Sequence, residues 1–598
     1  MSLSATAAAV PHEPAETRKL LLLIWGVTVG TYLLTGPGAG QNLSTDDAMR
    51  LVQVRDLIAG QGWFDVTQYR LNPPDGVALH WSRLIDLPIA ILIRAAELVL
   101  PTATAERLVL TIWPAGLLLA LLFGVIRFAR ELADDTAARL ALIFAAMMAP
   151  VLQHFRPGAI DHHSVQLVLT IWSVALLMRE GTRNAAFAGA LCALSLAIGQ
   201  ETAPAIAGIA GFVAMRWIVR GEPSRDSTAA FGMTFAAGTL FLFVATVPPA
   251  RHTVTTCDAF SIAQVVIAAC GGFGLAIQAA LRPPATVLKR AASAAGLGVV
   301  LALIVLAGFP ECLRDPYADL DPRLAALWLS NVNEARSIVS MMHDIPHEVL
   351  PYYGLPVIAL ALGLYRCWHE TDERRWGWIG ATTLIAIATM VAIWQVRGSA
   401  AANALALAVV PAALVRAFPA PEGGAIFFGL GRAVLLAALL VSPVALIASG
   451  KAIAWTAERV SGAQRPVVIS DGPGTCRLPS HYAPLANLPR GLVLGFIDAG
   501  PMILAETPHS VLAAPFHRNL KGNAAMFDVF LGLPEKAGAR LAALGVDYVA
   551  FCPGSPERHN YAAAAPEGLA AALARGEIPD ALKRVPLEGT DLMVFRRR

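Results

Sequence analysis

Two short motifs place carboxylates, accompanied in the second by imidazoles, beside apolar stretches. The first is Ser44-Thr45-Asp46-Asp47-Ala48-Met49-Arg50, shortly after the first apolar segment. The second is Asp161-His162-His163, where another apolar segment begins. Adjacent carboxylates near hydrocarbon repel each other unless a cation or an arginine neutralises them. An aspartate and a histidine two residues apart can offer an oxygen and a nitrogen to one ion, a mixed set that suits Mn²⁺ or Mg²⁺ better than structural zinc.

Each motif taken alone also has a purely structural explanation. Ser44 or Thr45 can cap a helix over 46–59, whose first turn favours acidic residues. Asp161 can cap the helix that follows it, with the histidines facing lipid headgroups. The membrane topology that the apolar segments predict places both motifs at one membrane face, where burying either motif without a partner is costly. The pair therefore favours a metal site.

Three further ionisable residues are expected at the same level. Glu201 lies in Gly199-Gln200-Glu201-Thr202, Glu334 in Asn331-Val332-Asn333-Glu334-Ala335-Arg336, and Arg397 in Trp394-Gln395-Val396-Arg397-Gly398-Ser399. Charged groups at membrane depth are functional candidates. Arg397 can equally well snorkel to the interface, but a guanidinium facing a metal site is also the usual means of holding a phosphate.

The composition shows what kind of element must position these residues. Of 598 residues, 56% are hydrophobic and 15% are charged, and the mean hydropathy is +0.57. These values suit a bundle of transmembrane helices and exclude a disordered chain, a disulfide-rich toxin and a coiled coil. The net charge of +3, from 46 basic and 43 acidic residues, gives no reason to expect a nucleic-acid partner.

The apolar segments predict a polytopic α-helical membrane protein with thirteen spans. We place these spans at residues 20–36, 109–127, 139–152, 164–178, 185–200, 203–219, 229–247, 259–281, 291–307, 350–367, 377–394, 399–416 and 426–449. Arginines and lysines cluster between alternate spans, beginning with Arg18 and Lys19. The positive-inside rule then puts the N-terminus in the cytoplasm, and an odd number of spans puts the C-terminus outside.

One apolar segment, 87–100, is not counted as a span. It is interrupted by Arg94 and Glu97 and ends at Pro101. Counting it would invert every later loop and place the basic clusters outside, so we expect it to lie flat at the membrane surface. No cleavage site of the A-x-A type follows the first span, so we expect that span to be retained as an anchor.

Three outward segments are too long to be simple turns: 37–108, 308–348 and 453–598. We therefore divide the chain into a transmembrane domain, 1–452, and a C-terminal domain, 453–598. In the latter, strand-length apolar runs alternate with alanine-rich helical runs at 534–544 and 567–575, which predicts a small α/β domain. The expected strands are Val467–Ile469, Leu492–Ile497, Val511–Ala514, Tyr548–Phe551 and Leu592–Phe595.

The cysteines agree with this topology. Cys257 and Cys312 fall in outward loops and Cys476 and Cys552 in the C-terminal domain, so two disulfides are possible in an oxidising compartment. The first pair could also remain as free thiols. No C-x-x-C pair is present, which argues against structural zinc.

This arrangement resembles the GT-C superfamily of membrane glycosyltransferases, and more particularly its oligosaccharyltransferase branch. That branch is similar in its thirteen spans, large first outward loop, soluble C-terminal domain and acidic motifs. By this resemblance Asp46 or Asp47 takes the place of the first acidic ligand, and Asp161 and His163 fit a D-x-H motif with His162 between them. Glu334 falls in the loop that carries the family's glutamate, although Val332-Asn333 is a poor match to its T-I. Arg397 resembles the arginine that contacts the lipid phosphate.

Two features keep the acceptor open. The W-W-D motif by which the branch recognises a protein sequon is absent, since no tryptophan follows Trp455. In addition, Asp46-Asp47-Ala48-Met49-Arg50 is similar to the D-E-x-x-R-like opening of sister enzymes that transfer one sugar onto lipid A, a polysaccharide or a protein hydroxyl. The resemblance therefore leaves a glycan, a lipid or a protein as acceptor.

The resemblance implies transfer of a sugar or oligosaccharide from a polyprenyl phosphate or diphosphate, dependent on Mn²⁺ or Mg²⁺ and inverting. Asp161, His163 and Asp46 or Asp47 would bind the ion, and Arg397 and His162 would hold the phosphate. Asp46, Asp47 and Glu334 are the candidate catalytic carboxylates, and Glu201 and Arg50 are further candidates. We expect an integral protein of a bacterial inner membrane, surrounded by lipid, with the C-terminal domain in the periplasm.

A transporter or flippase of a lipid-linked glycan is the alternative, because it too places charge in the membrane. It predicts inverted halves with discontinuous helices near the midplane, and the sequence has no evident repeat. In the C-terminal domain, Asp498, His481 and the run Phe516-His517-Arg518-Asn519 could contact the acceptor or could belong to a surface loop.

Overall fold

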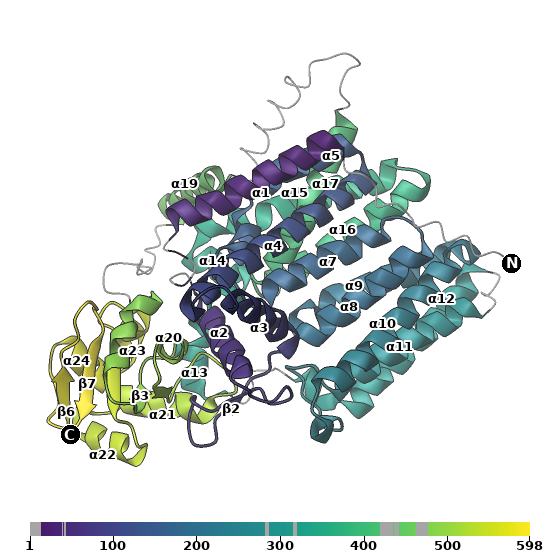
Figure 1. Cartoon of the computed structure of the whole chain (residues 1–598). Helices are drawn as coiled ribbons and strands as arrows, with labels where there is room; N and C mark the ends of the chain where they lie inside the picture. The colour runs from purple at the N-terminus through teal and green to yellow at the C-terminus, as the bar shows by residue number, and fades with distance from the viewer. Residues whose placement is uncertain are drawn as a thin grey trace.

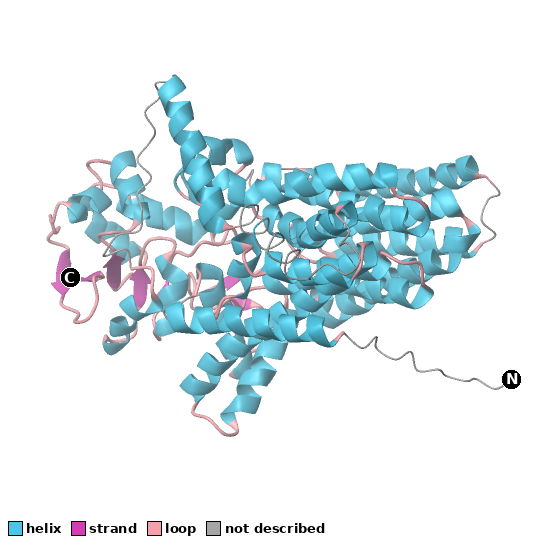
Figure 2. Ribbon diagram, turned by 90° about the horizontal axis from the view of Figure 1, so that it is seen from above, coloured by secondary structure: helices cyan, strands magenta, loops and turns pink. Residues whose placement is uncertain are grey.

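The computed structural model describes residues 14–36, 38, 40, 43–281, 286–314, 320–418, 435, 442–461 and 476–598. A bundle of long helices makes up most of the molecule, and a smaller domain with strands lies at one end of it (Figures 1 and 2). The span expected over 426–449 lies largely outside the described residues. The strand expected over Val467–Ile469 lies wholly outside them.

Nine helical segments among the described residues are long and apolar enough to cross a membrane. They are Ala15–Thr35, Thr102–Leu132, Gln200–Arg220, Glu222–Thr246, Ile262–Ala280, Val287–Gly308, Pro346–His369, Glu373–Trp394 and Gly398–Ala417. The corresponding helices are labelled in Figure 1. They are α1 (Ala15–Thr35), α4 (Thr102–Leu132), α9 (Ala203–Arg220), α10 (Arg225–Thr246), α11 (Ile262–Ala280), α12 (Val287–Leu303), α15 (Val349–His369), α16 (Asp372–Trp394) and α17 (Gly398–Ala417). Each is rich in Leu, Val, Ile and Ala over the length that a bilayer requires.

Three other helical segments in the bundle differ from a simple span. The chain expected to cross at 139–152 forms α5 (Asp135–Ala145) and α6 (Ala149–Leu152), and the segments Asp135–Ala145 and Ala149–Phe155 are bent by 74°. Two apolar helices are shorter, α7 (His163–Leu177) and α8 (Thr182–Ile198). The number of candidate spans in the described part is thus nine, or ten with the bent pair.

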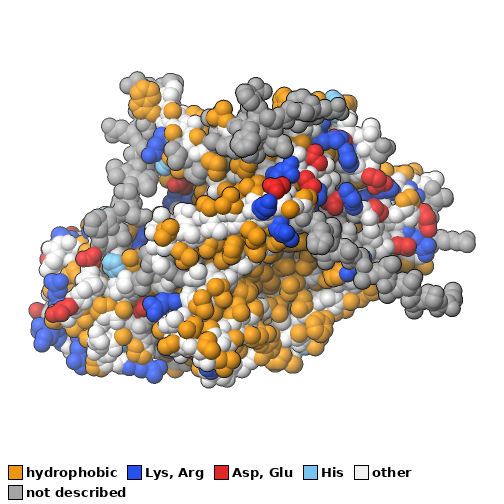
Figure 3. Space-filling model, turned by 45° about the horizontal axis from the view of Figure 1, so that its top comes forward, with side chains coloured by type: hydrophobic (Ala, Val, Ile, Leu, Met, Phe, Trp, Pro, Cys, Tyr) orange, Lys and Arg blue, Asp and Glu red, His pale blue; other side chains and the backbone are white. Residues whose placement is uncertain are grey.

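Hydrophobic side chains cover a broad band of the helical part, with few charged groups among them (Figure 3). Exposed leucines, valines and phenylalanines such as Leu34, Phe241 and Val244 belong to these helices. Lysine, arginine and acidic side chains gather beyond the band (Figure 3). A protein surface of this kind suits contact with lipid, because soluble proteins rarely expose large apolar patches.

The first long connection of the bundle is itself folded. It contains α2 (Thr45–Ile58), a two-stranded antiparallel pair of β1 (Thr67–Gln68) and β2 (Val77–Ala78), and α3 (Arg83–Glu97). Helix α3 includes most of the segment expected to lie at the membrane surface. Ile85, Ile89 and Ile93 recur at helical spacing and are buried, while Leu87 and Ile91 on the other side are exposed.

The C-terminal domain has a mixed five-stranded sheet in the order β4-β3-β5-β7-β6. The strands are β3 (Leu492–Leu494), β4 (Ser510–Val511), β5 (Tyr548–Phe551), β6 (Leu582–Val585) and β7 (Met593–Arg597). β3 pairs in parallel with β4 and β5, whereas β7 pairs antiparallel with β5 and β6. Helices pack around this sheet: α20 (Ala499–Glu506), α21 (Leu520–Phe530), α22 (Pro534–Ala543), α23 (Pro556–Ala564) and α24 (Leu569–Ala574). Before them, α19 runs over Pro443–Ser461 and extends across the domain boundary expected at 452.

The first connection and the C-terminal domain share one hydrophobic core, which includes Val52, Leu71, Ile503 and Val511. Backbone hydrogen bonds continue the sheet into this connection, from Val511 N to Arg70 O at 2.8 Å and from Asn72 N to Val511 O at 2.7 Å. Two disulfides, Cys257–Cys312 and Cys476–Cys552, join the pairs that the sequence makes possible. The C-terminal domain is therefore packed onto the part of the bundle that carries the first acidic motif.

Candidate active site

The two acidic motifs meet where α2 begins and where the chain enters α7. A capping box starts α2: Ser44 Oγ accepts a hydrogen bond from Asp47 N, and Asp47 Oδ2 accepts hydrogen bonds from Ser44 N at 3.1 Å and Ser44 Oγ at 2.7 Å. Asp47 Oδ1 accepts from Ile160 N at 2.8 Å and from Asp161 N at 3.0 Å. The buried Asp47 carboxylate thus ties the second motif to the helix that carries the first.

Asp161 lies at the centre of the cluster and is 8% exposed. Its Oδ1 lies 2.6 Å from His162 Nδ1 and accepts a hydrogen bond from Arg50 at 3.2 Å. Its Oδ2 is 3.4 Å from His163 Nε2 but makes no hydrogen bond within the described part of the chain. Although burial alone would raise the pKa of Asp161, His162 and His163 hold that pKa well below its usual range. The carboxylate is therefore ionised and has one oxygen free for a ligand.

His162 is buried between two carboxylates. Its Nδ1 faces Asp161, and its Nε2 lies 3.4 Å from Glu201 Oε1 with no hydrogen bond among the described groups. Burial favours the neutral imidazole, but Asp161 and Glu201 outweigh it and raise the pKa of His162 to about 10. In this arrangement His162 lies between the carboxylates of Asp161 and Glu201, and its contact with a donor phosphate stays a prediction.

A buried arginine supports Asp161 from behind. Arg50 is fully buried, donates to Asp86 Oδ1 at 2.9 Å and to Asp161 at 3.2 Å, and lies 4.5 Å from the centre of the Trp81 ring. Arg83 donates to the other oxygen of Asp86 at 3.1 Å. Since each charge has a partner of opposite sign, the network can hold Asp161 in one orientation inside the protein.

Glu334 and Arg397 close the other side of the cluster. Arg397 N donates to Glu334 O at 3.1 Å, and the Arg397 guanidinium lies 3.6 Å from Glu334 Oε1. Glu334 Oε2 is 4.0 Å from His163 Nε2. The loop containing Glu334 is thus attached to the turn before α17 and reaches the second motif.

Asp46 faces the same group of charges, one residue before the capping aspartate. Burial and the nearby carboxylates of Asp161 and Glu334 raise the pKa of Asp46 well above its usual range. A cation that binds between carboxylates that repel one another in this way stabilises their ionised forms. The residues therefore fit a divalent cation, with the unpartnered Asp161 oxygen and His163 Nε2 as the central donors and Asp46 and Glu334 as further oxygen donors. Asp161, His162 and His163 each place a donor atom within 4.8 Å of the others.

Two cavities border this cluster. The first, of about 320 Å³, is lined by His163, Glu201, Glu334, Arg397 and apolar side chains of α7, α16 and α17. The second, of about 310 Å³, is lined by His162, Glu201, Trp81 and residues around Asp258 and Arg518. Glu201 borders both cavities. Residues of the charged cluster therefore line both cavities.

Sequence reasoning missed the residues that support the cluster. Asp86 and Arg83 gave a signal, since they are ionisable groups within the apolar segment that becomes α3. A second group of donors, His80, Asp258 and His517, comes from three distant parts of the chain and has no local motif. Only His517 lies in a run that the sequence had singled out.

Comparison with known proteins identifies the fold. The sequence matches no family model and no curated protein. Three solved structures of the oligosaccharyltransferase AglB from Archaeoglobus fulgidus have similar folds. The complex with an inhibitory peptide and a dolichol-phosphate superposes with a TM-score of 0.64 at 15% identity, over 93% of this chain and 72% of AglB. The form tethered to an acceptor peptide gives 0.65 at 16% identity over 93% and 72%, and the complex with Zn and sulfate gives 0.61 at 16% over 97% and 73%.

At such low identity the likeness shows the fold and nothing finer. The chain shares the fold of AglB and has a mixed-sheet domain at its C-terminal end.

Proposed function

We propose that the chain is an integral membrane glycosyltransferase that moves a sugar or oligosaccharide from a polyprenyl phosphate or diphosphate to an acceptor. The observation that carries this proposal is the charged cluster around Asp161, whose residues line two cavities: His163 and Glu334 line the first, His162 the second, and Glu201 both. A transferase needs one volume for its donor and another for its acceptor, with the charged groups between them. The GT-C fold supports the same assignment.

The first cavity suits the donor. Its apolar lining includes Leu167, Ile387 and Val391, and Arg397 is its arginine. Apolar walls favour an isoprenoid chain, and an arginine at the membrane interface binds a phosphate. The second cavity, bordered by Trp81 and by polar loops, is then left for the acceptor.

We assign Asp161, His163 and Asp46 as the residues that would hold Mn²⁺ or Mg²⁺. Bound there, the ion would stabilise the negative charge that develops on the departing phosphate. Arg397 binds the same phosphate, and Glu334 holds Arg397 in place. Asp47 positions the Asp161 backbone, since both of its oxygens already accept hydrogen bonds.

The acceptor nucleophile requires a group that orients it or takes its proton. Asp46 and Glu334 are the carboxylates proposed for this role, because both face the cluster. Attack from the second cavity on a donor held in the first displaces the phosphate from the opposite side. This geometry favours inversion at the anomeric carbon.

We further propose thirteen spans, with the N-terminus in the cytoplasm and the site at the outer face. In a bacterium this places the protein in the inner membrane and the C-terminal domain in the periplasm. The disulfide Cys476–Cys552 supports an oxidising compartment for that domain, and Cys257–Cys312 supports the same compartment for the outward loops. A glycan, a lipid and a protein all remain as acceptor classes.

The test is consumption of a radiolabelled polyprenyl-linked sugar by the purified full-length protein in lipid nanodiscs. We expect turnover with Mn²⁺ or Mg²⁺, loss of turnover in EDTA, and a loss of at least about a hundredfold in Asp161→Asn. The matched control is Asp226→Asn, an exposed aspartate in the first turn of α10. This control should leave turnover unchanged.

The same assay separates the transporter alternative. A flippase would move the intact lipid-linked glycan between leaflets of a proteoliposome without cleaving the sugar from its phosphate. Full transbilayer movement by Asp161→Asn, with no sugar transfer by the wild type to lipid, glycan or peptide acceptors, would overturn the transferase proposal.

A further inference from the structure

A second group of metal-ligating side chains lies outside the site assigned above. His80 follows β2, Asp258 lies in the loop before α11, and His517 lies in the loop before α21. Their donor atoms all lie within 4.8 Å of one another. The three segments are far apart in the sequence, so the cluster forms only where the first connection, the bundle and the C-terminal domain meet.

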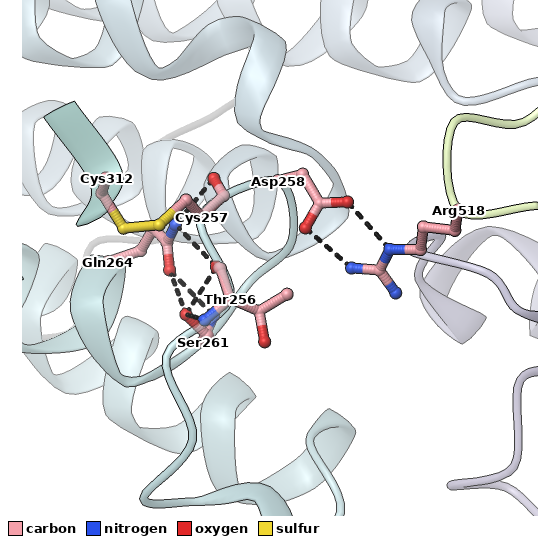
Figure 4. Close-up of a disulfide and its surroundings, with 7 residues drawn as sticks. All are labelled: Thr256, Cys257, Asp258, Ser261, Gln264, Cys312 and Arg518. Carbon is pink, nitrogen blue, oxygen red and sulfur yellow. Dashed lines mark hydrogen bonds and ion pairs between the residues drawn. A yellow bond between two sulfur atoms is a disulfide. The ribbon is translucent and has the colours of Figure 1, made fainter. Parts of the chain in front are cut away.

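The loop that carries Asp258 is fixed on both sides. Cys257 next to it is joined by a disulfide to Cys312. Ser261 Oγ accepts from Thr256 N at 3.1 Å, and Gln264 Nε2 donates to Thr256 O at 3.3 Å. Figure 4 shows these contacts, with the Asp258 carboxylate directed away from the disulfide toward Arg518.

The loop that carries His517 is held from within the C-terminal domain. Buried Asn523 accepts from Ala514 N at 3.1 Å and donates to Ala514 O at 2.9 Å, and buried Asn519 donates to Leu512 O at 3.0 Å. Phe516 packs edge-on against Trp81, with ring centres 5.3 Å apart. The side chain of His517 therefore projects from a rigid loop.

The side chains of the cluster already interact without an ion. His517 Nε2 lies 2.6 Å from Asp258 Oδ2, and the ring centres of His80 and His517 are 5.0 Å apart. Arg518 donates to both oxygens of Asp258, at 2.8 Å each, and to Ala78 O at 3.3 Å. Ligating carboxylates are usually held by such outer hydrogen bonds, which fix their direction.

We propose that His80, Asp258 and His517 form a second divalent-cation site, suited to a borderline ion such as Zn²⁺. Two imidazoles and one carboxylate are a ligand set typical of zinc sites that keep one position open. Zinc binds nitrogen and oxygen at about 2.0–2.2 Å, so two ligand atoms on one ion are at most about 4.4 Å apart. The donor atoms of the cluster, all within 4.8 Å of one another, are close to that separation.

The surroundings indicate what the open position faces. His80, Asp258 and Arg518 line the cavity of about 310 Å³ that also reaches His162 and Glu201. An ion there would join the C-terminal domain to the loop before α11 at the edge of this cavity. It would also present a free coordination position to an oxygen of any molecule bound inside.

The experiment measures zinc binding in a chain that lacks the first cluster. The full-length Asp161→Asn, His163→Ala variant is purified, stripped with EDTA, equilibrated with micromolar ZnCl₂ and passed through a desalting column before zinc is counted by mass spectrometry. We expect one zinc per chain. In this background His80→Ala or His517→Ala should weaken binding at least about tenfold, whereas the control His559→Ala, in α23, should not.

Two further readouts keep the test decisive if a variant is unstable. Co²⁺ in place of zinc should give a visible d–d absorption that disappears in His80→Gln. Zinc should raise the melting temperature of the background and leave that of His80→Gln unchanged. Equal zinc binding by the background, His80→Ala and His517→Ala, or no zinc bound by the background, would overturn the proposal. Since the background lacks Asp161 and His163, the central donors of the first cluster, neither result depends on the transferase function.

Discussion

Neighbouring aspartates in the first motif have different environments because helix geometry turns them in different directions. Asp47 is the third residue of α2, where the capping box uses its carboxylate, and the same side chain binds the backbone of the second motif. Asp46 is left facing Asp161 and Glu334. At the residue scale, the site thus divides into carboxylates that position the backbone and carboxylates available to a ligand.

Replacing Asp47 should therefore affect folding before chemistry. Asp47→Ala removes a helix cap and two hydrogen bonds to the second motif, so we expect a loss of about 1–3 kcal/mol in the free energy of unfolding. Thermal melting in nanodiscs measures this loss. Asp46→Ala should melt like the wild type or higher, because it relieves repulsion, while turnover falls. Equal stability of the wild type and Asp47→Ala would refute the positioning role.

Arg50 binds two buried carboxylates, and its removal takes one cationic partner from each, leaving Asp86 with Arg83 and Asp161 with its histidines. We expect Arg50→Met to destabilise the protein by about 3–5 kcal/mol, whereas adding Asp86→Asn to it should restore part of the loss. A double-mutant cycle on melting temperature measures the coupling. Additive effects of the two substitutions would show that Arg50 and Asp86 do not support each other.

The imidazole of His162 should make the metal-free protein sensitive to alkali. Its folded pKa is raised to about 10, above the unfolded value of about 6.5. Protonated His162 stabilises the folded protein through its two carboxylate neighbours. This stabilisation is fully present below pH 6.5 and is lost as the pH rises through about 10. After EDTA treatment, the melting temperature of the wild type should fall between pH 8 and pH 10.5 more steeply than that of His162→Gln. Parallel pH profiles of the two proteins would contradict this.

At the scale of elements, local sequence patterns predict most helices and strands, whereas features that depend on tertiary packing are missed. Hydropathy predicted the candidate spans of the bundle. A strand-length apolar run predicted β5 at Tyr548–Phe551, and an alanine-rich run predicted the helix α22. The strand β6 was missed because Lys583 and Arg584 give it the polar character of an edge strand. The bend between α5 and α6 was also missed, since both pieces are apolar and only their packing separates them.

The residues of the candidate site likewise divide into those that a local motif indicates and those that only the fold brings together. The sequence identified Asp46, Asp161 and His163 because acids and imidazoles beside apolar segments are unusual. It could not choose between Asp46 and Asp47, since that choice depends on which face of α2 meets the second motif. Asp258 was not identified, because a lone aspartate in a loop becomes informative only when His80 and His517 are folded next to it.

The disulfide at Asp258 gives a prediction at this scale. Cys257 and Cys312 are separated by 55 residues, and closing a loop of that size stabilises a protein by about 4 kcal/mol in the chain-entropy model. Cys257→Ser with Cys312→Ser should lower the melting temperature and increase hydrogen exchange in the loop before α11. Glu201 and His162, which that loop does not hold, should keep their protection. A loop with unchanged exchange would show that Ser261 and Gln264 fix it without the disulfide.

At the scale of the whole molecule, the C-terminal domain completes the second cavity by supplying Arg518 to its wall. Its attachment depends on Arg70 of the first connection. The Arg70 guanidinium donates to Leu504 O at 2.9 Å, to Thr507 O at 2.8 Å and to His509 O at 3.3 Å, around the C-terminal end of α20. A cation at this position also complements the negative end of the helix dipole.

Arg70→Ala should loosen the domain without unfolding the bundle. Charge-assisted hydrogen bonds contribute about 1.5–3 kcal/mol each, so amides of α20 and β4 should exchange with deuterium faster while those of α16 and α17 do not change. If the second cavity receives the acceptor, the same variant should raise the acceptor KM several-fold and leave kcat close to that of the wild type, because Asp161 and Arg397 are untouched. The matched control is Arg575→Ala, an exposed arginine paired with Glu577 in the same domain. Unchanged exchange in Arg70→Ala, or a fall in kcat at constant KM, would mean that the domain does not shape the acceptor side of the site.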